Sequence, residues 1–378
     1  MAQRVKTDWV LFLSTIALVS FGLVMVYSAS SYVARVRFEW SGYYIVRQLI
    51  WALIAFVVMM LLKRTDYRRL NSAGWAFGSI GVVVVLLVIV YFVDGRAHRF
   101  LRLGPVGIQP SEFAKPALIL FLAYFLTLRA RAINDRHTLL PAVITVGLLA
   151  IAVVMADLGT AVVLVVTAAV VLYVAGLSPK YIRIAFAVGI LGVGLAVVSK
   201  PYRLGRIIAF LDPGYKTLQQ FEWGRRIKDY LDQSVYTRDP DYHARQSKIA
   251  VGSGGLLGEG LMEGKQKLFY LPEAHNDFIY AVIGEELGLA GAASVLLVFL
   301  VILWRGLRLA RTADEFGRYL AVGVTAAIGV QAFINMSVVL GMAPTKGIPL
   351  PMISYGGSSL LSTLISLGLL LSVSEQSG

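Results

Sequence analysis

An aspartate, Asp277, stands where an apolar stretch begins, directly after the polar segment 271–276 (LPEAHN). It can cap a helix there, because an Asp side chain accepts hydrogen bonds from the unpaired amides of a helix start. Alternatively, its carboxylate can face a cavity and act as a general base. The positive end of a helix would lower its pKa, whereas a cavity of low dielectric constant would raise the pKa. The sequence leaves both roles open.

Two further acids, Glu285 and Glu286, follow about 12 Å deeper on the same predicted helix, at its usual rise of about 1.5 Å per residue. Acids at that depth are costly and are usually functional or paired. Glu285 shares the broad face of Asp277, whereas Glu286 lies on the opposite face. We therefore expect Glu286 to bind a helix end or a basic side chain, and we leave the role of Glu285 open.

Basic residues gather around a second predicted helix start, in the segment 96–115. Lys115 lies three residues after Glu112 on the same helix face, so the two side chains can form an ion pair near the membrane interface. Alternatively, Arg99, Arg102 and Lys115 build a pocket for an anion. These residues alone favour neither interpretation.

A third segment, 343–351, contains three prolines that stiffen it, and the small residues of 354–359 permit close backbone approach. Lys346 is the only charged residue between Arg318 and Glu375. A lone cation in a rigid apolar segment suggests a bound phosphate, with interfacial snorkelling as the ordinary alternative.

Several common functional motifs are absent. The glycines of 252–255 are not followed by the Lys-Ser/Thr of a nucleotide-binding P-loop, and the sequence has four His without a His-Glu-x-x-His zinc motif. Without Cys, the chain has no disulfide and no Cys nucleophile. We expect no organic cofactor and no nucleic-acid partner.

The composition is that of a membrane protein. Of the 378 residues, 57% are hydrophobic and 15% are charged, against about 25% charged in soluble domains. In such a chain, the net charge of +13 points to anionic head groups and phosphate-bearing substrates. We predict an all-α, polytopic fold in a single integral membrane domain, 1–378. About ten spans of near-bilayer length are expected: 9–27, 44–62, 73–93, 112–127, 139–156, 158–175, 182–199, 277–303, 319–340 and 357–374.

The distribution of basic residues predicts the orientation. With a cytoplasmic N-terminus, the inside segments carry about twice as many Lys and Arg as the short outside segments. Both termini are therefore expected inside. The segment 200–276, between the seventh and eighth spans, becomes one large extracytoplasmic loop, whose aromatic residues favour an ordered structure. The first span resembles a signal peptide superficially but is too long, so we expect it to be uncleaved.

Motifs along most of the chain resemble the SEDS family of shape, elongation, division and sporulation proteins. The matching segments are 22–30 (GLVMVYSAS), 108–115 (IQPSEFAK), 157–161 (DLGTA), 266–275 (QKLFYLPEAH), 344–347 (PTKG) and 354–359 (SYGGSS). Two of them, PEAH and PTKG, favour the division branch over the elongation branch. The chain departs from the family pattern at Asn276, where the family has Thr, at Phe100, where it has Trp, and before Asp157, where a pair containing Pro is missing.

The resemblance implies a ten-helix peptidoglycan glycosyltransferase that polymerises lipid II at the outer face of the bacterial cytoplasmic membrane, at the division septum. It implies a class B penicillin-binding protein and other divisome membrane proteins as partners, and lipid II and an undecaprenyl-pyrophosphate-linked glycan as substrates. Alternatives are a lipid II flippase, a polymerase of cell elongation, and a scaffold. The clustering of polar residues at the outer ends of spans favours chemistry over transport.

The family's essential aspartate corresponds to Asp277, which we expect to act as the base in an inverting transfer that releases undecaprenyl pyrophosphate. Asp277 could instead hold a divalent cation, Mg²⁺ or Mn²⁺, beside the substrate phosphates. Amides of the glycine-rich loop are expected to help bind the pyrophosphate. The predicted substrate contacts are Arg99, Arg102, Ser111, Glu112, Lys115, Glu273, His275, Lys346 and Ser358.

Overall fold

The computed structural model describes residues 7–94, 99–103, 106–199, 201–212, 216–234, 242–344 and 347–376. Within these residues, nine helices are long and apolar enough to cross a membrane, and a tenth apolar helix is shorter, at 17 residues. These ten helices are α1 (Trp9–Phe38), α2 (Tyr43–Arg64), α3 (Ala73–Val93), α4 (Pro110–Arg129), α5 (Arg136–Ala156), α6 (Leu158–Val174), α7 (Pro179–Val198), α11 (Ile279–Thr312), α12 (Glu315–Val339) and α13 (Gly357–Gln376). The predicted spans are confirmed in number and order.

The remaining elements are short. They are the 3₁₀ helices η1 (Tyr67–Leu70), η2 (Ala130–Ala132) and η4 (Leu218–Gln220), the helices α8 (Pro201–Leu211), α9 (Glu222–Ser234) and α10 (Tyr242–Ser253), and the antiparallel strands β1 (Leu101–Leu103) and β2 (Val106–Ile108). The described part of the large loop is thus mainly helical. The strands form a small hairpin that the sequence did not predict, directly before α4.

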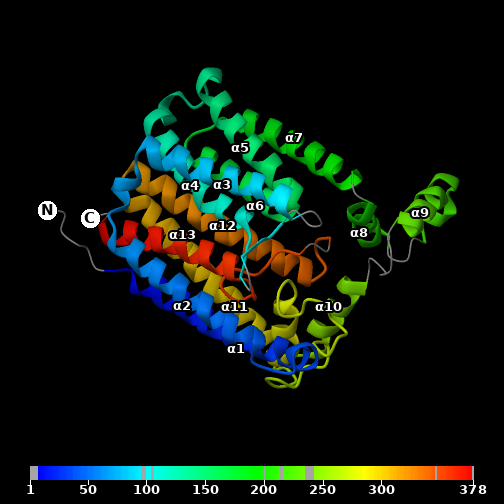
Figure 1. The fold of residues 1–378 in the computed structure, drawn as a ribbon. Helices are drawn as coiled ribbons and strands as arrows, with labels where there is room; N and C mark the ends of the chain where they lie inside the picture. Colours follow the sequence, from blue (N-terminus) through cyan, green and yellow to red (C-terminus); the bar gives the residue numbers. More distant parts are fainter. Residues whose placement is uncertain are drawn as a thin grey trace.

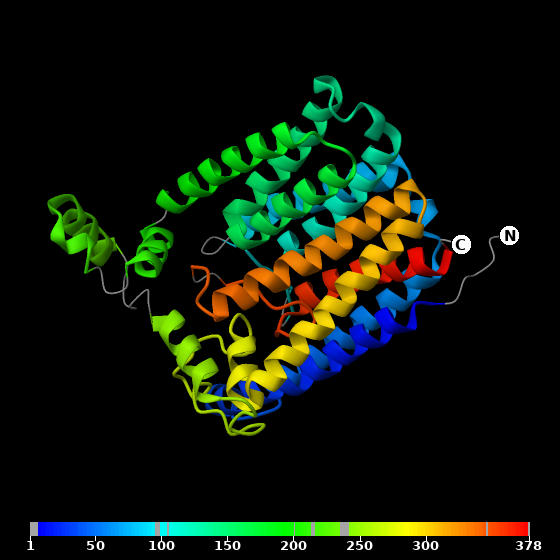
Figure 2. The same cartoon turned by 180° about the vertical axis from the view of Figure 1, so that it is seen from behind.

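The helices form one bundle whose centre is made by α4, α12 and α13. In the most apolar 18-residue stretches of α12 and α13, 72% and 78% of the residues are buried, against 6% in the corresponding stretch of α7. The helices α1 and α2 lie along one side of α11 to α13, and α3 to α7 lie along the other (Figures 1 and 2). In α7, most apolar side chains are therefore left for lipid, while the small and polar residues of α13 are used inside the bundle.

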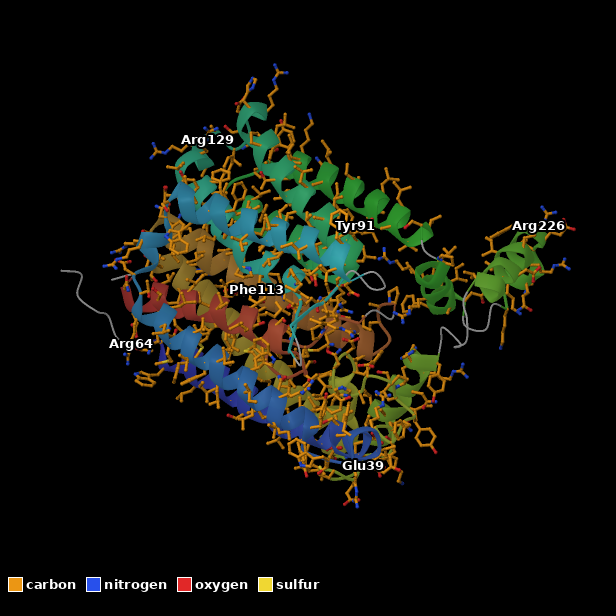
Figure 3. All side chains as sticks on the ribbon, viewed as in Figure 1. Glu39, Arg64, Tyr91, Phe113, Arg129 and Arg226 are labelled. Carbon is orange, nitrogen blue, oxygen red and sulfur yellow. The ribbon has the colours of Figure 1, made fainter. Side chains whose placement is uncertain are left out.

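Both ends of the described chain lie at the same end of the bundle. Thr7 donates a hydrogen bond to Glu375 at 2.6 Å, and Lys63 pairs with Glu375 at 3.1 Å. Figure 3 shows Arg64 and Arg129 at this end, with Glu39 at the opposite end. Since ten crossings return the chain to its starting side, this arrangement agrees with the predicted topology.

Two acids define the helix ends that the sequence predicted. Asp8 caps α1 by accepting a hydrogen bond from the Leu11 amide at 3.0 Å. Asp157 ends α5 and caps α6 by accepting from the Gly159 amide at 2.9 Å. Because one residue serves both helices, α5 and α6 form a tight hairpin, in agreement with the predicted spans 139–156 and 158–175.

The helix α11 is broken at Gly288, whose φ of 63° and ψ of −163° are available essentially only to glycine. The glycine-rich loop fills the break. The amides of Glu259 and Gly260 donate to the carbonyls of Glu285 and Glu286 at 2.9 and 3.0 Å. On the other side of the break, the amides of 289 and 290 donate to the carbonyls of 255 and 256, at 2.9 and 3.1 Å. The loop therefore replaces hydrogen bonds that the broken helix has lost.

Close approach to α11 explains why the loop is rich in glycine. A Cβ on Gly254 would overlap the carbonyl oxygen of Gly284, and a Cβ on Gly258 would overlap that of Glu286. Gly258 also has a φ of +85°, in the left-handed region. The expectation that these loop amides bind pyrophosphate is wrong for Gly258, Glu259 and Gly260, because their N–H groups are already paired within the protein.

We predict that Gly254→Ala lowers the free energy of unfolding by about 1–3 kcal/mol, because the new methyl group must displace a backbone carbonyl. Gly252→Ala, two residues earlier, is the matched control: its Cβ meets nothing within 4 Å, and alanine favours helix. Thermal unfolding in detergent checks the pair. Equal melting temperatures for the two variants would contradict the close packing of the loop on α11.

Candidate active site

The carboxyl group of Asp277 lies just outside α11. The helix begins at Ile279, and its N-cap residue, Phe278, provides no side-chain cap. The helix-cap interpretation of Asp277 is therefore wrong. The residue keeps some exposed surface, yet its Oδ1 atom is buried and has no hydrogen-bond partner among the described residues. Its Oδ2 atom lies so close to Gly347 that a Cβ at that position would overlap it.

The backbone around Asp277 is fixed by hydrogen bonds from α12 and from the segment 347–356. Asn335 of α12 donates from Nδ2 to the carbonyls of Asp277 and Ile348, at 2.9 and 2.7 Å. The Ser354 hydroxyl donates to the carbonyl of Asn276 at 2.6 Å. One amide side chain thus joins the aspartate to the proline-rich segment, which the sequence could not pair.

The electrostatic surroundings of Asp277 are mixed. Burial raises its pKa from 3.8 to about 7, and this is the largest effect. Arg99 lowers the pKa, Glu273 and Asp157 raise it, and Arg206 lowers it by a smaller amount. The balance gives a carboxyl group that exchanges its proton near neutral pH.

The two arginines that lower the pKa of Asp277, Arg99 and Arg206, come from different parts of the chain. Arg99 pairs with Asp157 through Nη2 at 3.6 Å, and its Nε atom is buried without a partner among the described residues. Arg206 belongs to α8, in the large loop, and the sequence did not single it out. Arg102, on β1, is exposed, so its predicted substrate contact stays a prediction.

Lys115 and Glu112 form a buried ion pair at 2.8 Å, with side chains only 7% and 3% exposed. Lys115 also donates to Oε1 of Gln331 at 2.6 Å, and Gln331 donates to the carbonyl of Pro349 at 2.8 Å. Beside Lys115 lies a cavity of about 10 Å³, about the size of one water molecule. The structure favours the ion-pair interpretation and excludes outward snorkelling, because the ammonium group is enclosed.

Two serines predicted as substrate contacts meet at Gln109, directly before α4. The Gln109 amide donates to Ser358 at 2.9 Å, and its side chain donates to Ser111 at 3.0 Å. All three residues are buried. They join the start of α4 to the start of α13, and their contact with substrate stays a prediction.

His275 lies two residues before Asp277, in the same segment. Its ring packs against Tyr44 and Tyr355, with centroids 4.5 and 5.6 Å away, and its pKa is lowered mainly by burial. Glu273 is exposed. We therefore expect neutral His275 to stabilise this segment by packing against the two tyrosine rings. Another predicted site residue, Lys346, lies outside the described residues.

Sequence reasoning missed the basic partner of Glu286. Lys267 pairs with Glu286 at 2.6 Å, and both side chains are almost completely buried. The structural role expected for Glu286 is therefore confirmed. No periodic pattern relates the two residues, so only the family motif that contains Lys267 drew attention to it.

A family model described as a cell cycle protein, FtsW/RodA/SpoVE, matches residues 8–378. The chain belongs to the FtsW/RodA/SpoVE family. This membership confirms the resemblance to SEDS proteins and agrees with the ten-helix bundle described above.

Relatives within the FtsW/RodA/SpoVE family match nearly the whole chain. A probable peptidoglycan glycosyltransferase FtsW of Geobacter sulfurreducens is 40% identical, covering 98% of this chain and 96% of the relative. Stage V sporulation protein E of Bacillus subtilis is 38% identical, covering 99% of each. Among solved structures, a chain of a peptidoglycan synthase complex that coordinates polymerization and crosslinking matches with a TM-score of 0.71 and 28% identity, covering 98% of each chain.

We predict that Asp277→Asn raises the stability of the protein most at alkaline pH. The folded pKa of about 7 lies above the ordinary value of 3.8, so ionisation opposes folding as the pH rises from about 4 to 7 and the penalty is constant above that. Asparagine has no such penalty. Melting temperatures at pH 5 and pH 8 check this: the advantage of the variant should be larger at pH 8, and an equal difference at both values would contradict the raised pKa.

We predict that Lys115→Met lowers the free energy of unfolding by about 3–5 kcal/mol, because it leaves Glu112 buried without its partner. The double variant Lys115→Met/Glu112→Gln should recover most of this loss. Thermal unfolding measures stability, and binding of lipid II by the double variant measures the alternative role. Weakened binding by a double variant of normal stability would support an anion pocket at Lys115.

Proposed function

We propose that Asp277 is the general base of a glycosyltransferase that polymerises lipid II into glycan strands. The single observation that carries this proposal is a carboxyl group with a pKa of about 7, held within electrostatic reach of Arg99 and Arg206. Its Oδ1 atom has no hydrogen-bond partner in the part of the chain that the structure describes. A base whose pKa lies near the working pH transfers protons most effectively. The relatives named FtsW support the same activity.

The reaction joins two lipid-linked saccharides. Oδ1 of Asp277 takes the proton from the 4-hydroxyl of the acceptor, and the resulting oxygen attacks the anomeric carbon of the donor. The bond from that carbon to the diphosphate oxygen breaks, the configuration inverts, and undecaprenyl pyrophosphate leaves with the bonding electrons. Arg99 and Arg206 stabilise the negative charge that develops on this leaving group.

A divalent cation, Mg²⁺ or Mn²⁺, would supply further charge neutralisation at the diphosphate. Within the described residues, no group of three or more His, Asp, Glu or Cys side chains could hold a metal ion. Oδ1 of Asp277 has no hydrogen-bond partner among the described residues, and Mg²⁺ commonly uses one or two carboxylates together with substrate phosphates. A cation here would therefore arrive with the substrate and would compete with the proton for Oδ1.

The chain is a multi-pass membrane protein, and we propose that its termini are cytoplasmic and that Asp277 faces the outer side. The basic residues near the termini, such as Arg64 and Arg129 (Figure 3), support this orientation. We propose that the protein acts at the division septum. The similarity to a chain of a peptidoglycan synthase complex supports a partner that crosslinks the strands, a class B penicillin-binding protein, among other divisome proteins.

We predict that Asp277→Asn abolishes glycan polymerisation by the purified chain with its partner, because the amide cannot accept the acceptor proton, while lipid II still binds. Asp229→Asn, at an exposed position on α9, is the matched control and should retain the wild-type rate. Gel analysis of labelled glycan products measures both variants. In the wild type, kcat/KM should rise with pH through about 7 and then level off. A polymerising Asp277→Asn variant would contradict the assignment of the base.

A further inference from the structure

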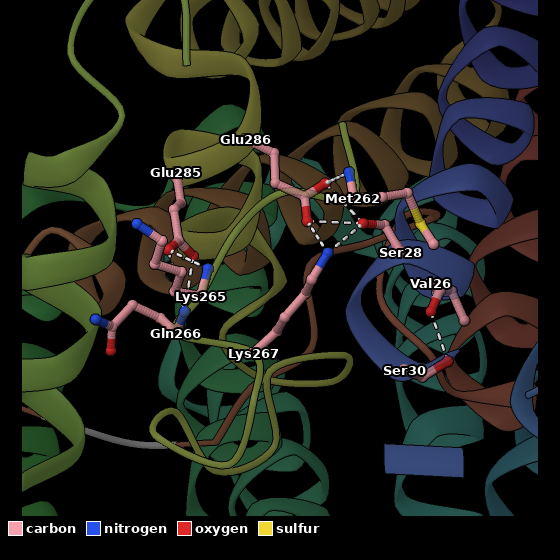
Figure 4. A network of polar contacts seen from close by, with 9 residues as sticks. All are labelled: Val26, Ser28, Ser30, Met262, Lys265, Gln266, Lys267, Glu285 and Glu286. Atoms are coloured by element: carbon pink, nitrogen blue, oxygen red, sulfur yellow. Dashed lines mark hydrogen bonds and ion pairs between the residues drawn. The ribbon is translucent and has the colours of Figure 1, made fainter. Parts of the chain in front are cut away.

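Lys267, Glu286 and Ser28 form a buried polar cluster that the proposed chemistry does not use. Their exposed fractions are 4%, 0% and 1%. The Lys267 ammonium group donates to Glu286 at 2.6 Å and to the Ser28 hydroxyl at 3.1 Å. Ser28 itself donates to Glu286 at 2.7 Å, and the Met262 amide donates to the same carboxylate at 3.2 Å (Figure 4). The cluster therefore joins α1, α11 and the loop before Asp277.

The neighbouring acid strengthens the same junction. Glu285 accepts hydrogen bonds from the backbone amides of Lys265 and Gln266, at 2.7 and 3.1 Å. Gly264 lies against both glutamates, with no room for a Cβ next to the Glu285 carboxylate. Two adjacent acids of one helix thus contact four consecutive residues of the loop, 264–267.

The contact between Lys267 and Glu286 closes the residues 267–286 into a ring, with Asp277 near its middle. Lys267 precedes Asp277 by ten residues, and Glu286 follows it by nine. The stretch 268–278 has no helix or strand of its own. Its course therefore depends on contacts with other segments: Asn335 and Ser354 hold its C-terminal part, and the Lys267–Glu286 ion pair joins the residues that flank it.

Stability alone does not explain why the chain buries the Lys267–Glu286 ion pair. Removing two charges from water costs several kcal/mol per ion, and apolar residues of similar size often stabilise a protein as well or better. A buried charged pair instead has a demanding geometry, because each group must meet its partner to offset its own desolvation. Such a pair selects one arrangement of the loop over others of similar compactness.

We propose that Lys267 is a positioning residue for Asp277: by pairing with Glu286 and Ser28, it holds the ring 267–286 so that the carboxyl group faces the reacting sugar. The inference deepens the proposed function and rests on it for the catalytic part. A displacement of about 1 Å at a reacting group can reduce a rate about 100-fold, so loss of the ion pair should act on kcat far more than on substrate binding.

The experiment compares Lys267→Met, Glu286→Gln and the double variant with wild type. Each single variant leaves a buried group unpaired and should lose stability as well as rate. The double variant removes both charges of the pair, so its melting temperature should recover, yet its kcat should stay about 10- to 100-fold below wild type with KM nearly unchanged. Recovery of kcat together with stability would overturn the positioning role.

A matched control comes from the opposite end of the bundle. Lys63 and Glu375 form another buried ion pair, at 3.1 Å. The double variant Lys63→Met/Glu375→Gln should keep a wild-type kcat after the same removal of charge. If it loses kcat as much as the Lys267→Met/Glu286→Gln variant, the effect reports general loosening of the bundle, and the specific role of Lys267 is wrong.

A second measurement does not depend on enzymatic activity. Because the chain contains no Cys, Asn276→Cys introduces a single thiol next to Asp277. We expect its labelling by a maleimide to be about tenfold faster in the Lys267→Met/Glu286→Gln background than in the otherwise wild-type chain, and unchanged in the Lys63→Met/Glu375→Gln background. Equal labelling rates would overturn the positioning role. An inactive wild-type enzyme with the expected labelling pattern would instead overturn the proposed function alone.

Discussion

The structure depends on one constraint, the burial of a carboxyl oxygen: Oδ1 of Asp277 has no hydrogen-bond partner within the described ranges of the chain. Water would solvate the ionised form of Asp277, and its enclosure beside Gly347 removes part of that solvation, which raises the pKa of the carboxyl group to about 7. Arg99 and Arg206 keep the charged form accessible by opposing this effect. A group so balanced can accept a proton near neutral pH, and the proton would go to Oδ1, which no described residue contacts by a hydrogen bond.

Holding such a group requires support from other segments, because the stretch 268–278 around it has no helix or strand of its own. Asn335 of α12 donates to the Asp277 carbonyl. From the segment 347–356, Ser354 donates to the carbonyl of the preceding residue, Asn276, and Gly347 lies against the Asp277 side chain. Lys115 contributes at a distance, through Gln331 and the carbonyl of Pro349. Lys115, which the sequence predicts as a substrate contact, is thus part of the network that supports the segment next to the carboxyl group.

The break in α11 links the loop to the membrane bundle. At Gly288 the helix exposes carbonyl and amide groups, which would be costly in an apolar setting, and the glycine-rich loop satisfies them. The loop is thereby tied to the same helix that begins beside Asp277. Fold and site are consequently not separable here, since the segment that completes the helix is also the one that leads to the carboxyl group.

The sequence by itself determined the ten apolar helices, the shared Asp157 between α5 and α6, and the position of Asp277 at the mouth of a span, because hydropathy and helix-end chemistry act over neighbouring residues. It also pointed to the possible pairing of Lys115 with Glu112, three residues apart. Only the tertiary structure decided that Asp277 does not cap its helix and that Arg206 lies near it. It alone decided that Lys267 pairs with Glu286, 19 residues away. These outcomes depend on burial and on contacts between distant segments, and no local pattern encodes which side chains meet once the helices have packed.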